Sequence, residues 1–368
     1  MAQHLIIRAW LAAAVLGAAG CATPGPLEPT PLGQDELDAF LASGRDARNY
    51  GITTYEDAAG PRFEFANRIH LGRTARLDFA SAAGSSQPVV RAEPPLTDKF
   101  PVLLDSSARQ CWATMESMKG LVYRPFAPPT GEYPDHVSAA IPGYAGVGNK
   151  LVFGEVHVEN PVFYVPPARG GLGPLARAGE NPAAAPQAAK AADLLARRTP
   201  IVAGAAWMRA FAFLRFDFPA RAVTLSTSGA FRPAAASAVR ANLPLRDWKG
   251  RPAVEAVLDG QPILLVIDTA GDFALSLPGE ATPDVPANLT LGGIAFDGVQ
   301  PVSHAAIGLP EAFPARLGLG LLARYAVTLD YKNQRVWLED PAGVAPESSA
   351  PSAPEDPPDP IHYRGVRP

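Results

Sequence analysis

Two stretches of the sequence decide its fold: FPVLLDSSA at residues 100–108 and ILLVIDTAG at residues 263–271. In each, an apolar run ends in an aspartate, Asp105 or Asp268, and a small hydroxyl residue follows. A short apolar run of this kind predicts a buried strand. Two buried strands that each deliver one carboxylate can bring these groups face to face, where they share a proton and activate a water molecule. We therefore take Asp105 and Asp268 as the candidate catalytic residues.

The repeat continues downstream of each aspartate. FAFLRFDF at residues 211–218 and RYAVTLDY at residues 324–331 each precede a second apolar triplet, VTL or VWL. Asp217 and Asp330 align without a gap, and we interpret them as turn residues rather than catalytic ones. Each half thus runs from an aspartate-ending strand to a hairpin. Because neither half alternates strands with helices, a doubly wound α/β fold is disfavoured.

The composition of the chain argues against several classes of ligand. A formal net charge of −4 with no basic stripe argues against a nucleic-acid partner. The two cysteines and six scattered histidines show no metal-binding spacing, so we expect neither a metal nor a cofactor.

The N-terminus has the form of an export signal. An apolar run at residues 9–16 follows Arg8 and is too short to span a bilayer, so residues 1–20 are predicted to be a signal peptide. The small residues before Cys21 resemble the cleavage box of bacterial lipoproteins, which implies that Cys21 carries a lipid. Because Ala22 follows, the resemblance implies an outer-membrane lipoprotein of the bacterial cell envelope that faces the periplasm. Ordinary signal cleavage with a chance cysteine is the alternative.

The remaining chain divides by composition and pattern. A proline- and glycine-rich tether with a short helix precedes the first half, an Ala/Pro-rich insertion interrupts it, and an acidic, proline-rich tail with little apolar content follows the second. The predicted boundaries are 21–61 for the tether and helix, 62–230 for the first lobe with its insertion near 170–198, 231–340 for the second lobe, and 341–368 for a disordered tail. Strands are expected at residues 67–71, 75–79, 151–153, 155–158 and 162–165.

These motifs resemble the retropepsin and pepsin class of aspartic peptidases. In the second half the resemblance rests on IDTA at residues 267–270, Leu317-Gly318 and VTLDY at residues 327–331. The first half supplies its own aspartate motif, then Gly204-Ala205 and FDF at residues 216–218. The resemblance covers roughly residues 62–340 and implies a mainly β protein: two retropepsin-like β-barrel lobes that form a pepsin-like bilobed fold with a cleft between them.

The resemblance also implies a mechanism. Asp105 and Asp268 would polarise a water molecule for attack on a peptide bond of a peptide or protein substrate, without a cofactor. Ser106 and Thr269 would cross-bond the two loops and hold the carboxylates coplanar.

A glycine-rich run at residues 143–148 lies between two strand-like segments. It is predicted to be a flap hairpin over the substrate, with Gly143, Tyr144 and Gly146 at its mobile tip. An ordinary loop is the alternative.

The sequence departs from the family at one position in each motif. The glycine that follows Asp-Thr or Asp-Ser in the family is Ser107 in one half and Ala270 in the other. Two hypotheses follow. The protein is an envelope-anchored aspartic endopeptidase, or it is a catalytically inactive bilobed lipoprotein that binds peptides or an envelope partner.

Overall fold

The computed structural model describes about three fifths of the chain, including both aspartate motifs. The described residues are 30–31, 33–42, 47–50, 52–57, 60–65, 69–81, 85–93, 100–113, 118, 124–125, 132–133, 141–142, 144–165, 168–169, 201–279, 285–307 and 313–341. The leader with Cys21, the insertion at 170–198 and residues 342–368 lie outside them, so the predictions for these segments stay predictions.

The first half builds a seven-stranded sheet around the strand that carries Asp105. Its order is β5-β6-β16-β7-β14-β11-β8. The bounds are β5 Val89–Ala92, β6 Phe100–Leu104, β7 Trp112–Ala113, β8 Arg124–Pro125, β11 Tyr144–Val147, β14 Val162–Val165 and β16 Ile201–Ala203. A hairpin of β12 Lys150–Phe153 and β13 Val156–Glu159 extends from this sheet.

The second half repeats the plan around the strand that carries Asp268. Its sheet follows the order β25-β24-β21-β22-β27-β23-β26, and β20 pairs with β21. The bounds are β20 Arg246–Trp248, β21 Arg251–Leu258, β22 Gln261–Ile267, β23 Leu275–Leu277, β24 Ala287–Leu291, β25 Ile294–Val299, β26 Pro301–Ser303 and β27 Ala315–Leu317.

A six-stranded sheet joins the two halves. It has the order β19-β29-β28-β17-β18-β4 and contains both predicted hairpins. The bounds are β4 Thr74–Asp78, β17 Phe213–Asp217, β18 Ala222–Ser226, β19 Val239–Pro244, β28 Ala326–Asp330 and β29 Arg335–Glu339. The central pair is β17 with β28, where Arg215 lies opposite Thr328. Asp217 and Asp330 accept backbone N–H bonds from Ala220 and Asn333, so their predicted role in turns is confirmed.

Smaller elements complete the described chain. They are β1 Thr30–Pro31, α2 Gln34–Ala42, η1 Ala47–Tyr50, β2 Ile52–Asp57, β3 Gly60–Phe65, β9 Glu132–Tyr133, β10 Ile141–Pro142, β15 Ala168–Arg169, α6 Ala205–Met208, η3 Ala236–Ala238, η4 Ala305–Ile307 and α7 Leu319–Leu322. The hairpin of β2 and β3 was not predicted. No helix of the described part is long and apolar enough to cross a membrane.

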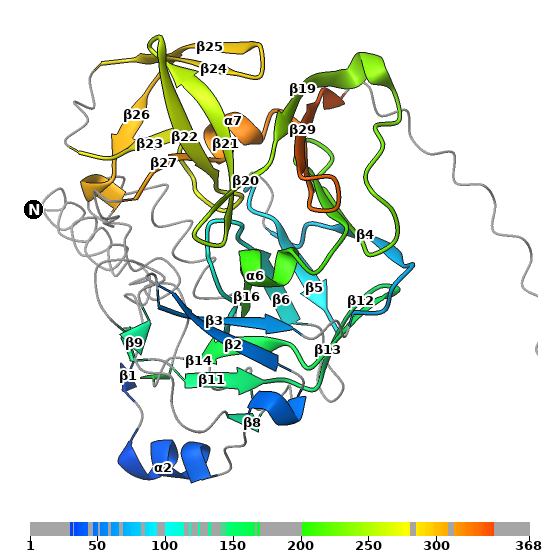
Figure 1. The fold of residues 1–368 in the computed structure, drawn as a ribbon, viewed down its shortest axis with the longest axis vertical. Coiled ribbons are helices and arrows are strands. Elements are labelled where there is room, and N and C mark those ends of the chain that lie inside the picture. Colours follow the sequence, from blue (N-terminus) through cyan, green and yellow to red (C-terminus); the bar gives the residue numbers. More distant parts are fainter. Residues whose placement is uncertain are drawn as a thin grey trace, which may run out of the picture.

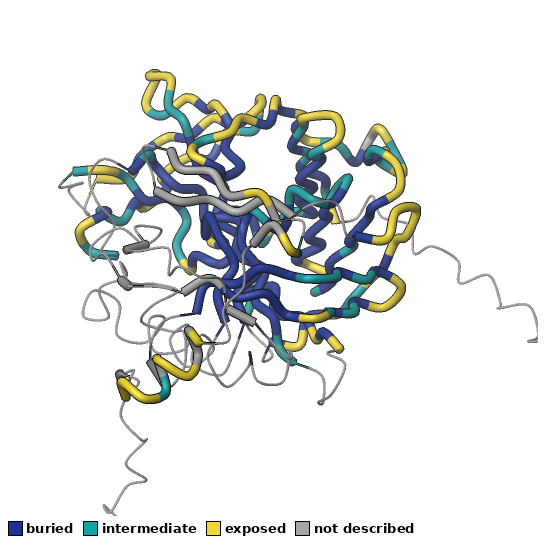
Figure 2. Tube along the Cα trace, turned by 60° about the horizontal axis from the view of Figure 1, so that its bottom comes forward, coloured by how far each residue is buried: buried dark blue, intermediate teal, exposed yellow. Residues whose placement is uncertain are grey.

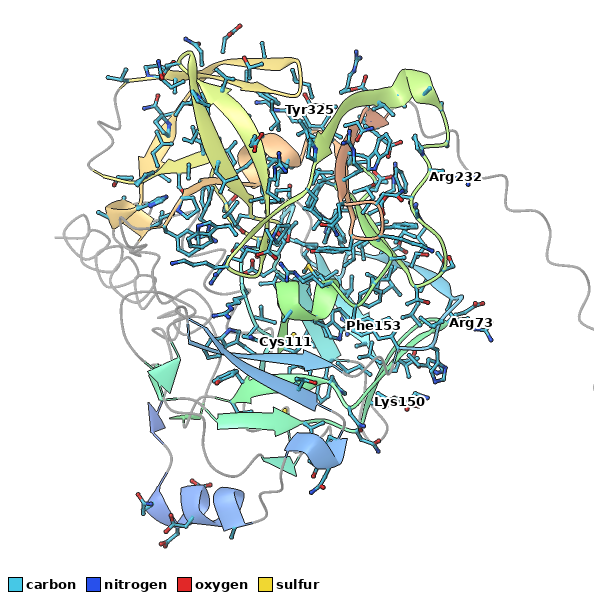
Figure 3. The ribbon with its side chains drawn as sticks, viewed as in Figure 1. Arg73, Cys111, Lys150, Phe153, Arg232 and Tyr325 are labelled. Atoms are coloured by element: carbon cyan, nitrogen blue, oxygen red, sulfur yellow. The ribbon has the colours of Figure 1, made fainter. Side chains whose placement is uncertain are left out.

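The elements form two lobes with one shared sheet. In Figure 1 the strands of the second half lie at the top, those of the first half lie below, and the six-stranded sheet lies to the right. Buried segments gather in the middle of the molecule, whereas exposed residues concentrate at hairpin turns (Figure 2). The largest cluster of core residues draws on both halves. Cys111 is buried inside the first lobe (Figure 3).

The predicted fold class is confirmed. The chain is mainly β and bilobed, with matching sheets around two aspartate-bearing strands. The cleft expected between the lobes and the predicted domain boundaries stay predictions.

Candidate functional site

The two candidate aspartates hold equivalent positions in the two lobes. Asp105 follows the end of β6, and Asp268 follows the end of β22. The backbone N–H of Asp105 donates to the carbonyl of Ala203 over 3.0 Å, and that of Asp268 donates to the carbonyl of Leu317 over 2.9 Å. Each aspartate is thereby fixed to the neighbouring parallel strand, β16 or β27. Both are buried, Asp105 with 5% and Asp268 with 0% of its surface exposed.

The residues after the aspartates tie the two loops together. The N–H of Ser106 donates to Oγ1 of Thr269 over 3.0 Å, and the N–H of Thr269 donates to Oγ of Ser106 over 3.2 Å. Each hydroxyl also donates across to the other lobe: Ser106 to the carbonyl of Ile267 (2.6 Å) and Thr269 to that of Leu104 (2.7 Å). These four hydrogen bonds form a closed, symmetrical network that fixes one loop against the other.

Two glycines allow this approach of backbones. Gly204 and Gly318 precede the short helices α6 and α7. A Cβ added to Gly204 would lie 2.1 Å from the carbonyl oxygen of Gln110, and one added to Gly318 would lie 2.2 Å from that of Phe273. Neither distance is compatible with a side chain, so glycine is required for close packing here.

Each carboxylate is held by its own loop. Oδ1 of Asp105 accepts the N–H of Ser107 (2.9 Å) and of Ala108 (3.2 Å). Oδ1 of Asp268 accepts the N–H of Ala270 (3.0 Å) and of Gly271 (2.7 Å). The difference is the hydroxyl of Ser107, which adds a third bond to Asp105 Oδ1 over 2.7 Å.

A second pair of equivalent residues links the lobes. Gln87 donates from Nε2 to the carbonyl of Ala270 over 2.9 Å, and Arg251 donates from Nε to the carbonyl of Ser107 over 2.7 Å. Each lies two residues before the strand residue, Val89 or Ala253, that pairs with the aspartate-bearing strand. Both side chains are buried. The first lobe contributes a neutral amide at this position, whereas the second lobe contributes a cation.

The largest departure from symmetry is Arg316 on β27. One Nη atom of Arg316 forms an ion pair with Oδ2 of Asp268 and donates to Oγ of Ser107. Its guanidinium lies over the rings of Phe273 and Phe313, with centroid distances of 5.6 and 5.8 Å. The residue is 7% exposed.

The first lobe has an apolar residue at the position of Arg316. Val202 of β16 pairs with Leu103 of β6, just as Arg316 of β27 pairs with Val266 of β22. The two lobes therefore differ at this position by a full positive charge.

Arg316 adds a buried positive charge at the two aspartate loops. Two adjacent carboxylates that share one proton carry a net charge of −1. A guanidinium stays protonated in proteins, so two ionised carboxylates together with Arg316 also carry a net charge of −1. Both oxygens of Asp268 are engaged, Oδ1 by two N–H groups and Oδ2 by Arg316.

The structure brings together four of the predicted site residues, Asp105, Asp268, Ser106 and Thr269; the catalytic role of the aspartates stays a prediction. Cys21 lies outside the described residues. Within the part of the chain that is described, no three His, Cys, Asp or Glu side chains gather in a way that could hold a metal ion.

Two of the three predicted flap residues lie within a strand. Tyr144 and Gly146 belong to β11, which is paired on both sides, with β14 and with β8. Gly146 is buried. In this region β8 pairs with β11 and β9 pairs with β10, so these strands form the two arms of a hairpin. Residues 134–140 between β9 and β10 lie outside the described chain, as does Gly143.

Sequence reasoning missed Arg251 and Arg316. The signal that could have found Arg316 is the internal repeat itself. The segment IVAG at residues 201–204 aligns with ARLG at residues 315–318, which places an arginine against a valine two residues before the glycine.

No known family profile matches the chain, and no curated protein matches it. Among solved structures, the chain is similar to the basic 7S globulin from soybean, at 12% sequence identity and a TM-score of 0.43. The match covers 73% of this chain and 95% of that chain. A likeness at this level supports no statement about the site or its activity.

Proposed function

We propose that this protein binds peptide segments at its paired-aspartate centre and, in the arrangement described, does not hydrolyse them. The observation that carries the proposal is the ion pair between Arg316 and Asp268. The peptide as ligand class comes from the resemblance of the repeated motifs to aspartic peptidases.

The physical argument concerns protons. Hydrolysis by an aspartate pair needs one carboxylate as a base toward water and one carboxylic acid to protonate the leaving nitrogen. Arg316 supplies the positive charge that the shared proton would otherwise supply, and it engages the oxygen of Asp268 that its own loop leaves open. The pair therefore lacks both the acidic proton and a vacant oxygen at Asp268.

Attachment to the bacterial envelope through a lipid on Cys21 is part of the proposal, with the periplasm as the site of binding. A Cys21→Ala variant should leave the membrane fraction or retain its leader. A wild-type protein without lipid mass at its mature N-terminus would contradict this part.

A second candidate is an aspartic endopeptidase. It is favoured by the intact cross-bonding of Ser106 and Thr269, which positions both carboxylates. A displacement of Arg316 from Asp268 would release the pair for catalysis.

The experiment replaces Arg316 with the residue of the equivalent position in the first lobe. Wild type, Arg316→Val and the double variant Arg316→Val with Asp105→Asn are incubated with a mixed peptide library from acidic to neutral pH. We expect wild type to bind peptides without cleaving them. We expect Arg316→Val to raise hydrolysis by roughly a hundred-fold or more, most at acidic pH where one proton is shared, and the double variant to lose it.

The matched control is Arg324→Val. Arg324 is exposed and lies just after α7, the helix that follows β27 and Arg316. It should behave as wild type. Cleavage by wild type that Asp105→Asn or Asp268→Asn abolishes would establish the second candidate in place of the first.

A further inference from the structure

We infer that the chain carries a second binding site, separate from the aspartate loops, for a small amphiphile whose apolar chain carries one anionic head group. The site is an open groove formed by four segments, residues 71–72, 209–212, 227–228 and 331–332. Its volume of about 620 Å³ falls within the range of about 300–1,000 Å³ that is usual for small-molecule sites. None of these residues belongs to the aspartate motifs, so the inference is independent of the proposed function.

Hydrogen bonds hold the four segments of the groove together. The N–H of Lys332, in the turn between β28 and β29, donates to the carbonyl of Ala212 over 3.0 Å. Oγ1 of Thr227, just after β18, donates to the carbonyl of His70 over 2.7 Å and accepts the N–H of Arg73 over 3.0 Å. The turn at residues 71–72 is thereby fixed from both sides. A groove whose walls are already ordered loses little conformational entropy when a ligand binds.

The groove has an aromatic floor and an apolar lip. Phe211 is buried, and its ring lies 4.9 Å from that of Trp207 in an edge-on contact. Tyr331 packs against the same core cluster. Leu71 at the lip is 79% exposed, the largest exposed fraction among the large hydrophobic residues that the structure describes as exposed. An apolar chain that lies in the groove would remove part of the Leu71 side chain from water, which is favourable.

The charges of the groove determine the head group. Two of the lining residues are cationic and none is acidic. The charge of Arg209 is balanced by an ion pair with Asp247. Lys332 is exposed and forms no ion pair within the part of the chain that the structure describes. One cation that is open to solvent beside an apolar wall suits a ligand with a single negative charge at the end of an apolar chain.

The test compares three ligands with the same alkyl chain and different head groups. Decanoate, decyltrimethylammonium and a neutral decyl glycoside are titrated into the full chain by isothermal titration calorimetry, at neutral pH, low salt and below their micelle concentrations. We expect decanoate to bind about three-fold or more tightly than the neutral ligand, and the cationic ligand to bind most weakly. Vesicles of an anionic phospholipid are titrated in parallel.

Variants of exposed residues locate the ligand. Lys332→Glu should invert the order, so that the cationic ligand binds more tightly than decanoate, whereas Arg324→Glu, outside the groove, should keep the order. Leu71→Ser should weaken all three ligands by about three-fold or more, and the exposed control Val257→Ser should not. Circular dichroism checks that each variant is folded, and the comparison of ligands on wild type stands without any variant.

Each outcome supports or overturns the inference. Equal affinity of wild type for all three ligands overturns the anionic head group, and an order that survives in folded Lys332→Glu overturns its placement beside Lys332. Binding of anionic vesicles without binding of free decanoate replaces the small-molecule site with a membrane-contact surface. Absence of binding to all three ligands overturns the site and leaves the proposed function untouched.

Discussion

At the scale of single residues, Ser107 replaces the glycine of the family motif and bonds to Arg316, the residue that breaks the symmetry between the lobes. Its hydroxyl donates to Asp105 and accepts from Arg316, which in turn pairs with Asp268. A glycine at position 107 would leave Arg316 without this acceptor. In sequence, Ser107 looks like an isolated loss of the motif's glycine, whereas in the structure it links one carboxylate to the other through a hydroxyl and a guanidinium.

A second residue permits a prediction about pH. Burial, together with the positive charges of Lys150 and His70, lowers the pKa of His157 below its usual 6.5. The unfolded chain therefore binds this proton more readily than the folded chain. The contribution of His157 to the free energy of unfolding is therefore complete above pH 6.5 and declines as the pH falls through the lowered pKa.

An NMR titration of His157 checks this shift. We expect a midpoint below 6.5 in wild type. Lys150→Gln should move it upward because a repelling charge is removed, and Glu159→Gln should move it downward because an attracting charge is removed. A midpoint that stays unchanged in both variants would contradict the electrostatic part of the explanation.

At the scale of elements, the turns before α6 and α7 define where each lobe meets its aspartate loop. Gly204 and Gly318 have φ values of −91° and −105°, which any residue can adopt. Glycine is needed there only because the carbonyls of Gln110 and Phe273 lie where a Cβ would be.

A substitution at one of these turns tests that requirement. We expect Gly318→Ala to lower the free energy of unfolding by about 2 kcal/mol, because the backbone of Phe273 or of α7 must move. Gly229→Ala is the matched control, since nothing lies within 4 Å of its Cβ position. Urea denaturation of both variants measures the difference, and equal stability of the two would refute the packing argument.

Elements with a strong local pattern could be predicted from the sequence. The strand expected at 75–79 corresponds to β4, that at 162–165 to β14, and the repeated hairpins to β17 with β18 and β28 with β29. The hairpin of β2 and β3 was missed because segments such as TTYED carry little apolar signal. The flap stays a prediction: Tyr144 and Gly146 lie in β11, and glycine occurs both in mobile turns and within strands.

The residues of the candidate site also fall into those that the sequence predicts and those that it does not. The aspartates and their hydroxyl neighbours are marked by local sequence. The ion pair of Arg316 depends on a partner 48 residues earlier in the chain (316 − 268), and its bond to Ser107 crosses between lobes. Such distant partners cannot be read from local sequence, and only the alignment of Arg316 with Val202 in the internal repeat could have indicated them.

At the scale of the whole molecule, a buried ion triad joins the lobes. Arg215 on β17 bonds to Asp217 over 2.9 Å and to Glu339 at the end of β29 over 3.1 Å. All three are buried. The triad therefore links a strand of the first half with a strand of the second.

Replacing the cation of this triad should weaken the whole molecule. We expect Arg215→Met to lower the free energy of unfolding by roughly 3 kcal/mol or more, because two buried carboxylates lose their counter-charge. The matched control is Arg240→Met. Arg240 is exposed and pairs with the half-buried Asp340, the neighbour of Glu339, so its loss should change stability little. Urea denaturation curves of both variants measure the free energy of unfolding. A small effect of Arg215→Met would show that the triad does not hold the lobes together.

The pairing of β17 with β28 also determines which halves can associate through the shared sheet. Arg215 lies directly opposite Thr328, and the position equivalent to Glu339 in the first half is Ser226. Two copies of the first half joined in this way would set one arginine against another, with serine where the compensating glutamate is needed. Such self-association is disfavoured by charge alone. The first half is therefore suited to complete the shared sheet with the second half, which places a threonine opposite Arg215 and supplies Glu339 as its counter-charge.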